Sequence, residues 1–248
     1  MSSPLEETAH AIRNAKCVVV STGAGISAES GIPTFRGDDG IWKKYPPEEY
    51  ATIYAYRADP VRVWAFWREL GHQMADCKPN PAHFALAHLE AAGHLEAIIT
   101  QNVDNLHQSA GSRNVIEYHG NAHNLVCTKC GHRVPLDFAA LPISPPHCIC
   151  GAIMKPDVVM FGELIPESAM SRAADLAARA DVFLIVGTSA QVFPAADLPT
   201  IAKRHGAFIA EFNLESTDFT VEITDAFIQG PAGNTLPALV PLVGVEKP

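Results

Sequence analysis

Short apolar runs alternate with segments of helical spacing along most of the chain. Four runs rich in apolar residues and bounded by polar turns are typical of buried strands, and they cover residues 16–20, 97–100, 182–186 and 208–212. Helical spacing covers residues 81–92, which are followed by Gly93, and residues 168–180. This alternation predicts an α/β fold, in which helices cover both faces of a doubly wound parallel sheet.

Two regions interrupt the alternation. Residues 121–156 contain cysteines, prolines and short apolar pieces without a long periodic segment. They predict a small lobe inserted into the sheet domain, which then comprises residues 1–120 and 157–248. Residues 34–59, rich in tyrosine and proline, predict a loop that covers a ligand site. At the N-terminus, the pattern S-P-L-E from Ser3 predicts a capped helix.

The composition is that of an ordinary globular protein with an acidic surface. Of the 248 residues, 48% are hydrophobic and 18% are charged, and the net charge is -9. This charge opposes binding to nucleic acid or to anionic membranes. No apolar stretch approaches the roughly 18 residues that a membrane span needs, and the N-terminus lacks the basic and then apolar pattern of a signal peptide. We therefore expect a folded cytoplasmic protein that does not contact a membrane.

Four of the six cysteines form a group with the spacing of a metal site. Cys127 and Cys130 make a C-x-x-C pair, and Cys148 and Cys150 make a C-x-C pair. Four thiolates at such spacing suit one tetrahedral zinc ion. They fill its coordination shell, so His132 and His147, which flank the cysteines, are not expected to bind the metal. Disulfides or merely buried thiols are the alternatives, but disulfides are rare in the cytosol. The full shell leaves no position for water, so we predict a structural zinc ion without a catalytic role.

A glycine-rich turn follows the first predicted strand. Residues 23–28, GAGISA, match the G-x-G-x-x-A fingerprint of Rossmann-like dinucleotide-binding domains. Gly23 permits a tight turn, Gly25 lets backbone N–H groups approach a pyrophosphate, and Ala28 lets a helix pack closely on the strand. A turn without a ligand is the alternative, although its place after a buried strand favours a nucleotide. No strand with an acidic residue follows about 20 residues later, so hydride transfer is not expected.

Polar side chains follow the other predicted strands, at the edge where open α/β sheets bind ligands. Residues 100–107 carry six polar side chains, although Asp104 could simply cap a helix. His119 lies beside a glycine and is a candidate general base, with a structural role as the alternative. Four residues after the third and fourth strands can hydrogen-bond ribose or phosphate oxygens: Gly187, Thr188, Ser189 and Asn213.

These motifs, in this order, resemble those of the sirtuins, which are NAD-dependent protein-lysine deacylases. The resemblance covers about residues 15–227 and includes the four cysteines. The matching segments are GAGIS (23–27), GIPTFR (31–36), QNVD (101–104), HG (119–120), FGE (161–163) and GTS (187–189). The C-x-C spacing in a compact chain is similar to the branch that contains bacterial deacylases and the mitochondrial desuccinylase type.

The resemblance implies how NAD is held. Phe35 would shield the nicotinamide ribose from water, and Arg36 would bind phosphate or ribose oxygens. Asn102 and Asp104 would orient the nicotinamide end, and Gln101 would bond the ribose. The implied cofactor-binding residues are Gly23, Ala24, Gly25, Ile26, Ser27, Ile32, Thr34, Phe35, Arg36, Gln101, Asn102, Asp104, Gly187, Thr188, Ser189 and Asn213.

The resemblance also implies the reaction, with Asn102 and His119 as catalytic residues. The acyl oxygen attacks the ribose carbon that nicotinamide leaves, and His119 then acts as general base on a ribose hydroxyl. The acyl group is transferred to ADP-ribose, giving nicotinamide, free lysine and O-acyl-ADP-ribose. Acylated-lysine proteins or peptides are the implied partners. They would pair as an added strand with Val158, Val159, Phe161, Gly162 and Glu163.

The predicted acyl pocket departs from that of its nearest relatives. Members that remove succinyl or malonyl groups carry Tyr-x-x-Arg on the helix after an Asp-Pro pair, where this chain has Trp67 and Leu70. A buried acyl carboxylate without a cation costs several kcal/mol, so acetyl or a longer neutral acyl group is expected. Desuccinylation or demalonylation is the alternative if Arg57, which lies before the Asp-Pro pair, reaches the pocket.

The sequence is also compatible with three other functions. An ADP-ribosyltransferase would use the same NAD site, and a non-catalytic NAD sensor would bind the cofactor without turnover. The complete set of catalytic residues argues against a sensor. A nucleic-acid binder with a zinc lobe is disfavoured by the acidic charge, although Lys129, Arg133 and Lys155 form a weak basic group in that lobe.

Overall fold

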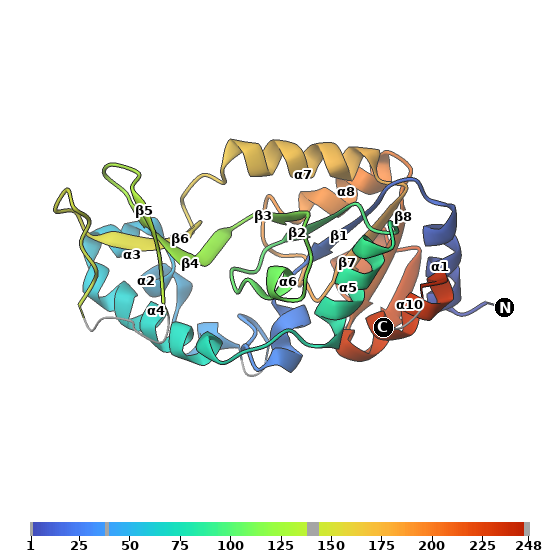
Figure 1. The fold of residues 1–248 in the computed structure, drawn as a ribbon, viewed down its shortest axis with the longest axis horizontal. Helices are drawn as coiled ribbons and strands as arrows, with labels where there is room; N and C mark the ends of the chain where they lie inside the picture. Colours follow the sequence, from blue (N-terminus) through green and yellow to red (C-terminus); the bar gives the residue numbers. More distant parts are fainter. Residues whose placement is uncertain (1, 38–39, 138–143, 246–248) are drawn as a thin grey trace.

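Helices cover both faces of a six-stranded parallel sheet in the computed structural model, which describes residues 2–37, 40–137 and 144–245 (Figure 1). The strands are β1 (Val18–Thr22), β2 (Ala97–Thr100), β3 (Val115–Glu117), β7 (Val182–Val186), β8 (Phe208–Asn213) and β9 (Ala226–Gln229). They lie in the order β3-β2-β1-β7-β8-β9, and every neighbouring pair is parallel. The predicted doubly wound α/β fold is confirmed.

Alternate residues of the strands build two separate cores. Val18 and Val20 of β1 pack with α1 (Pro4–Asn14), α5 (Pro81–Ala91) and α10 (Ala232–Val243). Val19, between them, packs on the other face with α7 (Glu167–Arg179) and α8 (Asp197–Arg204). Because side chains of a strand point alternately to opposite faces, a run that is apolar throughout needs cover on both sides.

The helix ends follow the capping signals in the sequence. At the start of α1, the Ser3 side chain accepts from the backbone N–H of Glu6, whose carboxylate accepts from the backbone N–H of Ser3 at 2.7 Å. At the start of α5, Asn80 accepts from the backbone N–H of Ala82 at 2.9 Å. No helix in the described ranges is both long and apolar enough to cross a membrane.

The small lobe is larger than the predicted insertion. Its antiparallel sheet has the order β5-β4-β6, formed by β4 (Gly120–Cys127), β5 (Arg133–Pro135) and β6 (Met154–Val158). This sheet shares one core with α2 (Pro47–Tyr50), α3 (Ile53–Ala58) and α4 (Pro60–Ala75), all at one end of Figure 1. The predicted boundaries placed α4 in the sheet domain, whereas its apolar face packs against the inserted lobe.

The region expected to be an irregular cover contains short helices. Besides α2 and α3, a 3-10 turn η2 spans Ile41–Lys43. Ile41 and Ile53 are buried in the core of the small lobe. Proline and tyrosine in residues 34–59 therefore mark short packed helices, and the helical periods are too short to recognise in the sequence.

Candidate active site

The candidate site lies where β1, β2, β7 and β8 end. Thr22, at the end of β1, is in register with Thr100 of β2 and Val186 of β7. Val186 is in register with Phe212, so the segments that follow these strands emerge side by side. The chain moves to one side of the sheet from β1 to β2 and to the other from β7 to β8, which makes the β1–β7 junction the switch point where such sheets bind ligands.

The glycine turn is shaped by a close crossing of two backbones. A Cβ on Gly25 would lie 2.7 Å from the Cα of Gly187, and a Cβ on Gly23 would lie 2.8 Å from the Gly187 carbonyl oxygen. The N–H of Gly25 donates to that oxygen at 2.8 Å. The close packing of the two backbones by itself therefore requires glycine at both positions. The turn continues as a 3-10 helix η1 (Ala24–Ser30), which contains Ile26, instead of the α-helix that the fingerprint predicts.

Asn102, Ser27 and Asp104 form one buried hydrogen-bonded chain. The Asn102 Nδ2 donates to the Gly23 carbonyl at 3.1 Å and to the Ser27 Oγ at 3.1 Å. Ser27 is fully buried, and its hydroxyl donates to Asp104 Oδ2 at 2.7 Å. The amide of Asn102 is therefore fixed in one orientation at the mouth of the β1 turn.

Asp104 also caps a short helix, α6 (Leu106–Ser109). Its Oδ1 accepts from the backbone N–H of Leu106 at 2.9 Å, so the capping role considered from the sequence is present beside the contact with Ser27. Burial raises the pKa of the Asp104 carboxyl, while the hydrogen bonds from Leu106 and Ser27 oppose that rise. An acceptor so placed suits a neutral donor group, such as a carboxamide N–H, in the adjoining site.

His119 is held in the tautomer that a general base needs. Its Nδ1 lies 3.3 Å from the carbonyl oxygen of Gln101. Because the carbonyl can only accept, Nδ1 carries the proton and Nε2 keeps a free lone pair. Burial lowers the pKa of His119, and the carbonyl of Gln101 partly offsets this effect. The imidazole is therefore neutral at neutral pH and able to accept a proton.

Thr188 connects the segments that follow three strands. The Gln101 Nε2 donates to the Thr188 Oγ1 at 3.2 Å, and the Asn213 Nδ2 donates to the Thr188 carbonyl at 2.9 Å. Ser189 follows Thr188 directly and is partly exposed. This edge presents hydroxyl and amide groups from β2, β7 and β8 within one short stretch, a donor set suited to ribose and phosphate oxygens.

The segment of residues 32–36 extends from the glycine turn toward the small lobe. Ile32 is buried, and its N–H donates to the Ser27 carbonyl at 3.3 Å. The Phe35 ring stacks on Trp42, with ring centroids 4.9 Å apart. The Thr34 hydroxyl donates to the carbonyl of Arg36 at 2.9 Å, and Arg36 is exposed.

The segment of residues 158–163 bridges the two parts of the molecule. The N–H of Val159 donates to the carbonyl of His119 at 2.8 Å. The N–H of Phe161 donates to the Ala51 carbonyl at 3.0 Å, and the Phe161 carbonyl accepts from Ile53 at 3.0 Å. Val158 is buried, while Phe161 and Gly162 are exposed. This segment thus contacts both His119 and the helical half of the small lobe.

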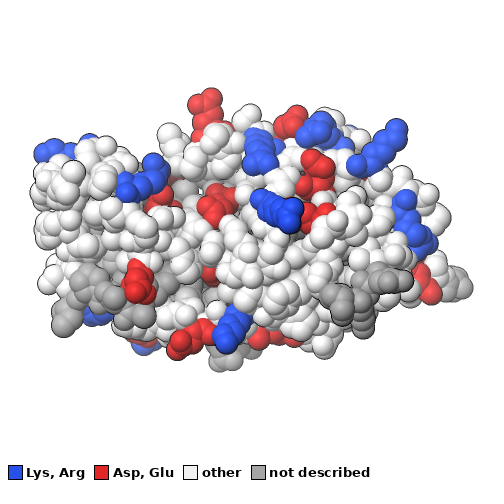
Figure 2. Space-filling view, in the orientation of Figure 1, with Lys and Arg blue, Asp and Glu red and all other residues white. Residues whose placement is uncertain are grey.

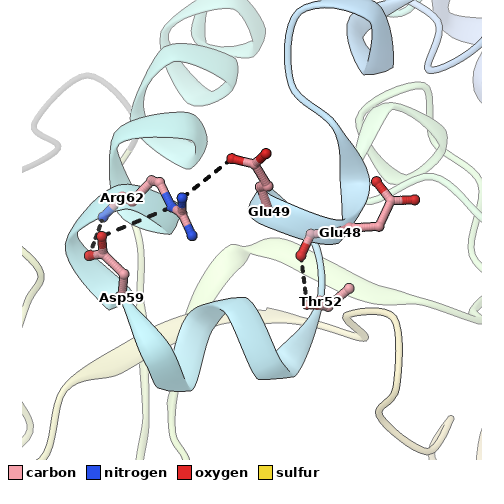
Figure 3. Close-up of polar contacts among 5 residues, drawn as sticks. All are labelled: Glu48, Glu49, Thr52, Asp59 and Arg62. Carbon is pink, nitrogen blue, oxygen red and sulfur yellow. Dashed lines mark hydrogen bonds and ion pairs between the residues drawn. The ribbon is translucent and has the colours of Figure 1, made fainter.

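Polar contacts fix the corner from which α4 starts (Figure 3). Asp59 caps the helix by accepting from the backbone N–H of Arg62 at 3.0 Å. The Arg62 side chain reaches Glu49 of α2 at 3.3 Å, and the Thr52 hydroxyl donates to the Glu48 carbonyl at 3.3 Å (Figure 3). The corner sets the direction of the helix that carries the two predicted acyl-pocket residues.

Trp67 and Leu70 are buried on α4, within the core of the small lobe. Their exposed fractions are 7% and 2%, and the same core includes Ile32 and Val158. Arg57, the alternative acyl-pocket cation, is exposed on α3, and Tyr54 beside it is 67% exposed. A buried neutral pair and a solvated arginine agree with the expectation of a pocket without a cation.

The four cysteines of the small lobe are positioned to bind a zinc ion. Their sulfur atoms all lie within 4.8 Å of one another, with 3.5 Å between Cys127 and Cys150 and 3.6 Å between Cys130 and Cys148. A disulfide bond is about 2.0 Å long, so these pairs are not bonded. Tetrahedral zinc with sulfur at about 2.3 Å needs sulfur pairs about 3.8 Å apart, close to the observed spacing. The predicted set of four cysteines is confirmed.

The backbone around the first cysteine pair favours a thiolate. The N–H of Cys130, with a smaller contribution from Lys129, lowers the pKa of Cys127 to about 6. A thiolate is the form that binds metal. Among the described residues, the group that could hold a metal contains no histidine, as expected from the full shell of thiolates.

Two buried histidines lie behind the site. His83 was not singled out from the sequence, and His107 was counted only among the polar residues of 100–107. His83 of α5 lies with Nε2 at 3.4 Å from the Ser27 hydroxyl, and His107 lies with Nε2 at 3.0 Å from the Thr22 hydroxyl. Burial lowers their pKa values, to about 4 for His83 and to about 3 for His107. Both imidazoles are therefore neutral at neutral pH, and they contact the hydroxyls of Ser27 and Thr22 from behind the site. The only sequence signal for His83 was a polar residue among apolar positions of a helix.

The weak basic group expected on the zinc lobe lacks one of its three members at the surface. Lys155 is 5% exposed and pairs with Glu163, and Arg133 pairs with Asp157. Figure 2 shows acidic and basic side chains interspersed on the face drawn. A phosphate backbone needs a continuous basic stripe. Lys155 was therefore wrongly included in the weak local patch expected from the sequence.

The comparisons with known proteins agree with the motifs. A sequence model described as the Sir2 family matches residues 23–194. An NAD-dependent protein deacylase of Pyrococcus furiosus is 48% identical over 242 residues, which cover 95% of this chain and 96% of that protein. The structure of a Sir2 homologue in complex with NAD aligns with a TM-score of 0.91 at 44% identity, covering 96% of this chain and 93% of that one. Sir2Af2 bound to a myristoylated histone peptide aligns with a TM-score of 0.82 at 38% identity, covering 97% and 96%.

The family inferred from the motifs is confirmed by these matches, since the family model covers residues 23–194 and the archaeal relative covers 95% of the chain. The similar archaeal protein carries the name of the activity that the resemblance implied. The fold, the sheet edge and the cysteine group agree with the same assignment. The chain belongs to the Sir2 family.

Proposed function

We propose that this chain removes neutral acyl groups from lysine side chains of proteins and transfers them to the ADP-ribose part of NAD, with release of nicotinamide. The observation that carries the proposal is His119, held neutral with a free Nε2 at the sheet edge that also presents the Asn102 amide. A base and an orienting amide at one nucleotide-binding edge suit group transfer to a ribose hydroxyl.

The residues at this edge fit NAD by their chemistry. Asp104 and Asn102 offer an acceptor and an amide for the nicotinamide carboxamide, and Ile32 supplies an apolar wall. Residues 187–189 and Asn213 offer hydrogen-bonding groups for ribose and phosphate, and the exposed Arg36 offers a cation. When bound, NAD supplies a ribose carbon open to attack and the ADP-ribose that accepts the acyl group.

The chain itself contributes proton transfer, orientation and exclusion of water. Nε2 of His119 takes a proton from the acceptor hydroxyl, while the Gln101 carbonyl stabilises the imidazolium that forms. Asn102 is fixed by Gly23 and Ser27 and holds the reacting end in place. The stacked Phe35 and Trp42 close the side that faces the small lobe.

Acylated-lysine proteins or peptides are the proposed substrates. A similar Sir2 structure carries a myristoylated histone peptide. In this chain, residues 158–163 link the two parts of the molecule: residues 158–160 continue from β6, residues 160–163 form a turn, and Phe161 is 42% exposed. Val158, Val159, Phe161, Gly162 and Glu163 would pair with the substrate backbone as a strand, which reads the backbone more than the side chains.

The proposed preference for neutral acyl groups rests on Trp67 and Leu70. Replacing them together by tyrosine and arginine, Trp67→Tyr with Leu70→Arg, supplies the hydroxyl and the cation that an acyl carboxylate needs. We expect the ratio of kcat/KM for succinyl-lysine to that for acetyl-lysine to rise by about tenfold or more. Leu70→Met, which keeps the volume, is the matched control. An unchanged ratio in a folded double variant would show that the acyl group binds elsewhere.

The reaction itself is tested by its mass balance. Purified protein is incubated with NAD and an acetyl-lysine peptide, and the products are followed by mass spectrometry. We expect nicotinamide, free lysine peptide and O-acetyl-ADP-ribose in equal amounts. Consumption of NAD without loss of the acetyl group, and with ADP-ribose attached to protein or peptide, would instead identify an ADP-ribosyltransferase.

A further inference from the structure

Lys155 is a buried cation that no step described above employs. It lies on β6 of the small lobe and is 5% exposed. Its Nζ donates to the carbonyl of Val158 at 2.5 Å and lies 2.9 Å from Glu163 Oε2. The Pro156 carbonyl is a third acceptor at 3.4 Å. An ammonium in such a position is stable only while these acceptors surround it.

The contacts of Lys155 hold residues 158–163 in one conformation. Glu163 Oε2, which contacts Lys155, also accepts from the backbone N–H of Met160 at 2.9 Å. The N–H of Glu163 donates to the Met160 carbonyl at 2.9 Å. The ammonium therefore joins the start of the segment, at Val158, to its end, at Glu163. If the segment straightened, the buried charge would lose two partners together.

The same segment is bonded to the backbone of His119. The residue after Val158 donates its N–H to the His119 carbonyl at 2.8 Å. Gly120, which follows His119, is in register with Val158 and has a φ of 80°; a Cβ there would lie 2.2 Å from the Asp157 carbonyl oxygen. The two strands thus approach too closely at this point for the segment to shift without moving His119.

We propose that Lys155 is a positioning residue for deacylation. Its ammonium holds residues 158–163 in the conformation that receives the acyl-lysine peptide and, through Val159, sets the backbone of His119. This inference rests on the proposed function, since it assigns a role within that reaction. Loss of the ammonium is therefore expected to impair binding and turnover of the peptide far more than binding of NAD. The reason is that, within the described residues, the contacts of Lys155 are to Pro156, Val158 and Glu163 and do not include the glycine turn or residues 187–189.

The test compares Lys155→Met, Lys155→Arg and a matched control in steady-state kinetics. Methionine keeps the length and apolar volume but removes the charge. We expect Lys155→Met to raise the KM for an acetyl-lysine peptide about tenfold and to lower kcat, with the KM for NAD changed by less than about twofold. Lys155→Arg, which can still contact Val158 and Glu163, is expected to stay within about threefold of the wild type.

The control is Arg133→Met, which breaks an ion pair of the same small sheet. Arg133 lies 2.6 Å from Asp157, but its side chain is 64% exposed, and within the described parts of the chain it forms no hydrogen bond or ion pair with residues 158–163. We expect its kinetic constants to stay within about twofold of the wild type, since exposed pairs contribute little. All variants are assayed below their melting temperatures, which are measured in parallel.

Two results would overturn the inference. One is a Lys155→Met enzyme with a lower Tm but with wild-type KM for peptide and wild-type kcat, which would leave only a structural role. The other is an equal rise in the KM values for peptide and NAD, which would indicate general loosening. If Lys155→Met does not fold, Glu163→Gln supplies the same comparison of peptide against NAD. A wild-type protein without deacylase activity would contradict the proposed function itself, which is a distinct outcome.

Discussion

Replacing His119 by alanine is expected to lower kcat for deacylation by about a thousandfold, while the Kd for NAD stays within about twofold. The imidazole is the proposed base, and the groups that fit NAD lie on other segments, at residues 23–27, 101–104 and 187–189. Turnover is followed by nicotinamide release, and binding is measured by calorimetry. His205→Ala, at the exposed end of α8, is the matched control and is expected to keep wild-type turnover. A His119→Ala enzyme with unchanged turnover would exclude the imidazole as the base.

The pH dependence follows from the environment of the same residue. Burial lowers the pKa of His119 below its ordinary value of 6.5. A base must be unprotonated, so kcat/KM is expected to stay high as the pH falls to 6.5 and to decline only below it. The profile is measured with an acetyl-lysine peptide at saturating NAD. An acid limb centred above 6.5 would contradict a buried neutral imidazole as the group that titrates.

Removal of zinc is expected to abolish activity although the metal takes no part in the reaction. Cys127→Ser, or treatment with a strong chelator, should release one zinc ion per chain and lower the Tm by about 10 °C or more. The reason is that β4, which carries Cys127, starts at Gly120 beside His119, and β6, which pairs with β4, ends at Val158. Loss of the lobe therefore displaces both His119 and the proposed peptide segment.

The control for zinc removal is Cys77→Ser, since Cys77 lies outside the metal group. We expect it to keep its zinc, its Tm and its activity. Zinc content is measured by atomic absorption and the Tm by calorimetry. A metal-free protein with full activity and an unchanged Tm would contradict a structural role for the four cysteines.

The sequence predicted the main elements because their signals are local. Strand β2 and strand β7 agree with their predicted residues, and α5 and α7 agree to within one residue at each end. Strand β1 was placed two residues too early, because the apolar run stops before Ser21 and Thr22, which are polar but buried. The short strands β3 and β9 were missed, since three or four residues give no periodic pattern.

The arrangement around the site was predicted less completely, because it depends on contacts between distant segments. The motif identified Gly23 and Gly25, but not that Gly187 crosses them so closely. Lys155 seemed to be a surface cation, because nothing local shows that Val158 and Glu163 enclose its ammonium. Likewise, α4 has an ordinary amphipathic pattern, and its packing against the inserted lobe appears only in three dimensions.

The measurement that tests the central claim most directly follows one peptide carrying acetyl-, butyryl-, myristoyl- or succinyl-lysine, incubated with NAD and analysed by mass spectrometry. We predict that O-acyl-ADP-ribose forms from the neutral acyl groups and scarcely from succinyl, because Trp67 and Leu70 provide no cation for a carboxylate. Succinyl as the best substrate would contradict the proposed pocket and would require a cation such as Arg57 to reach it. NAD consumption with no deacylation of any peptide would contradict the deacylase function itself.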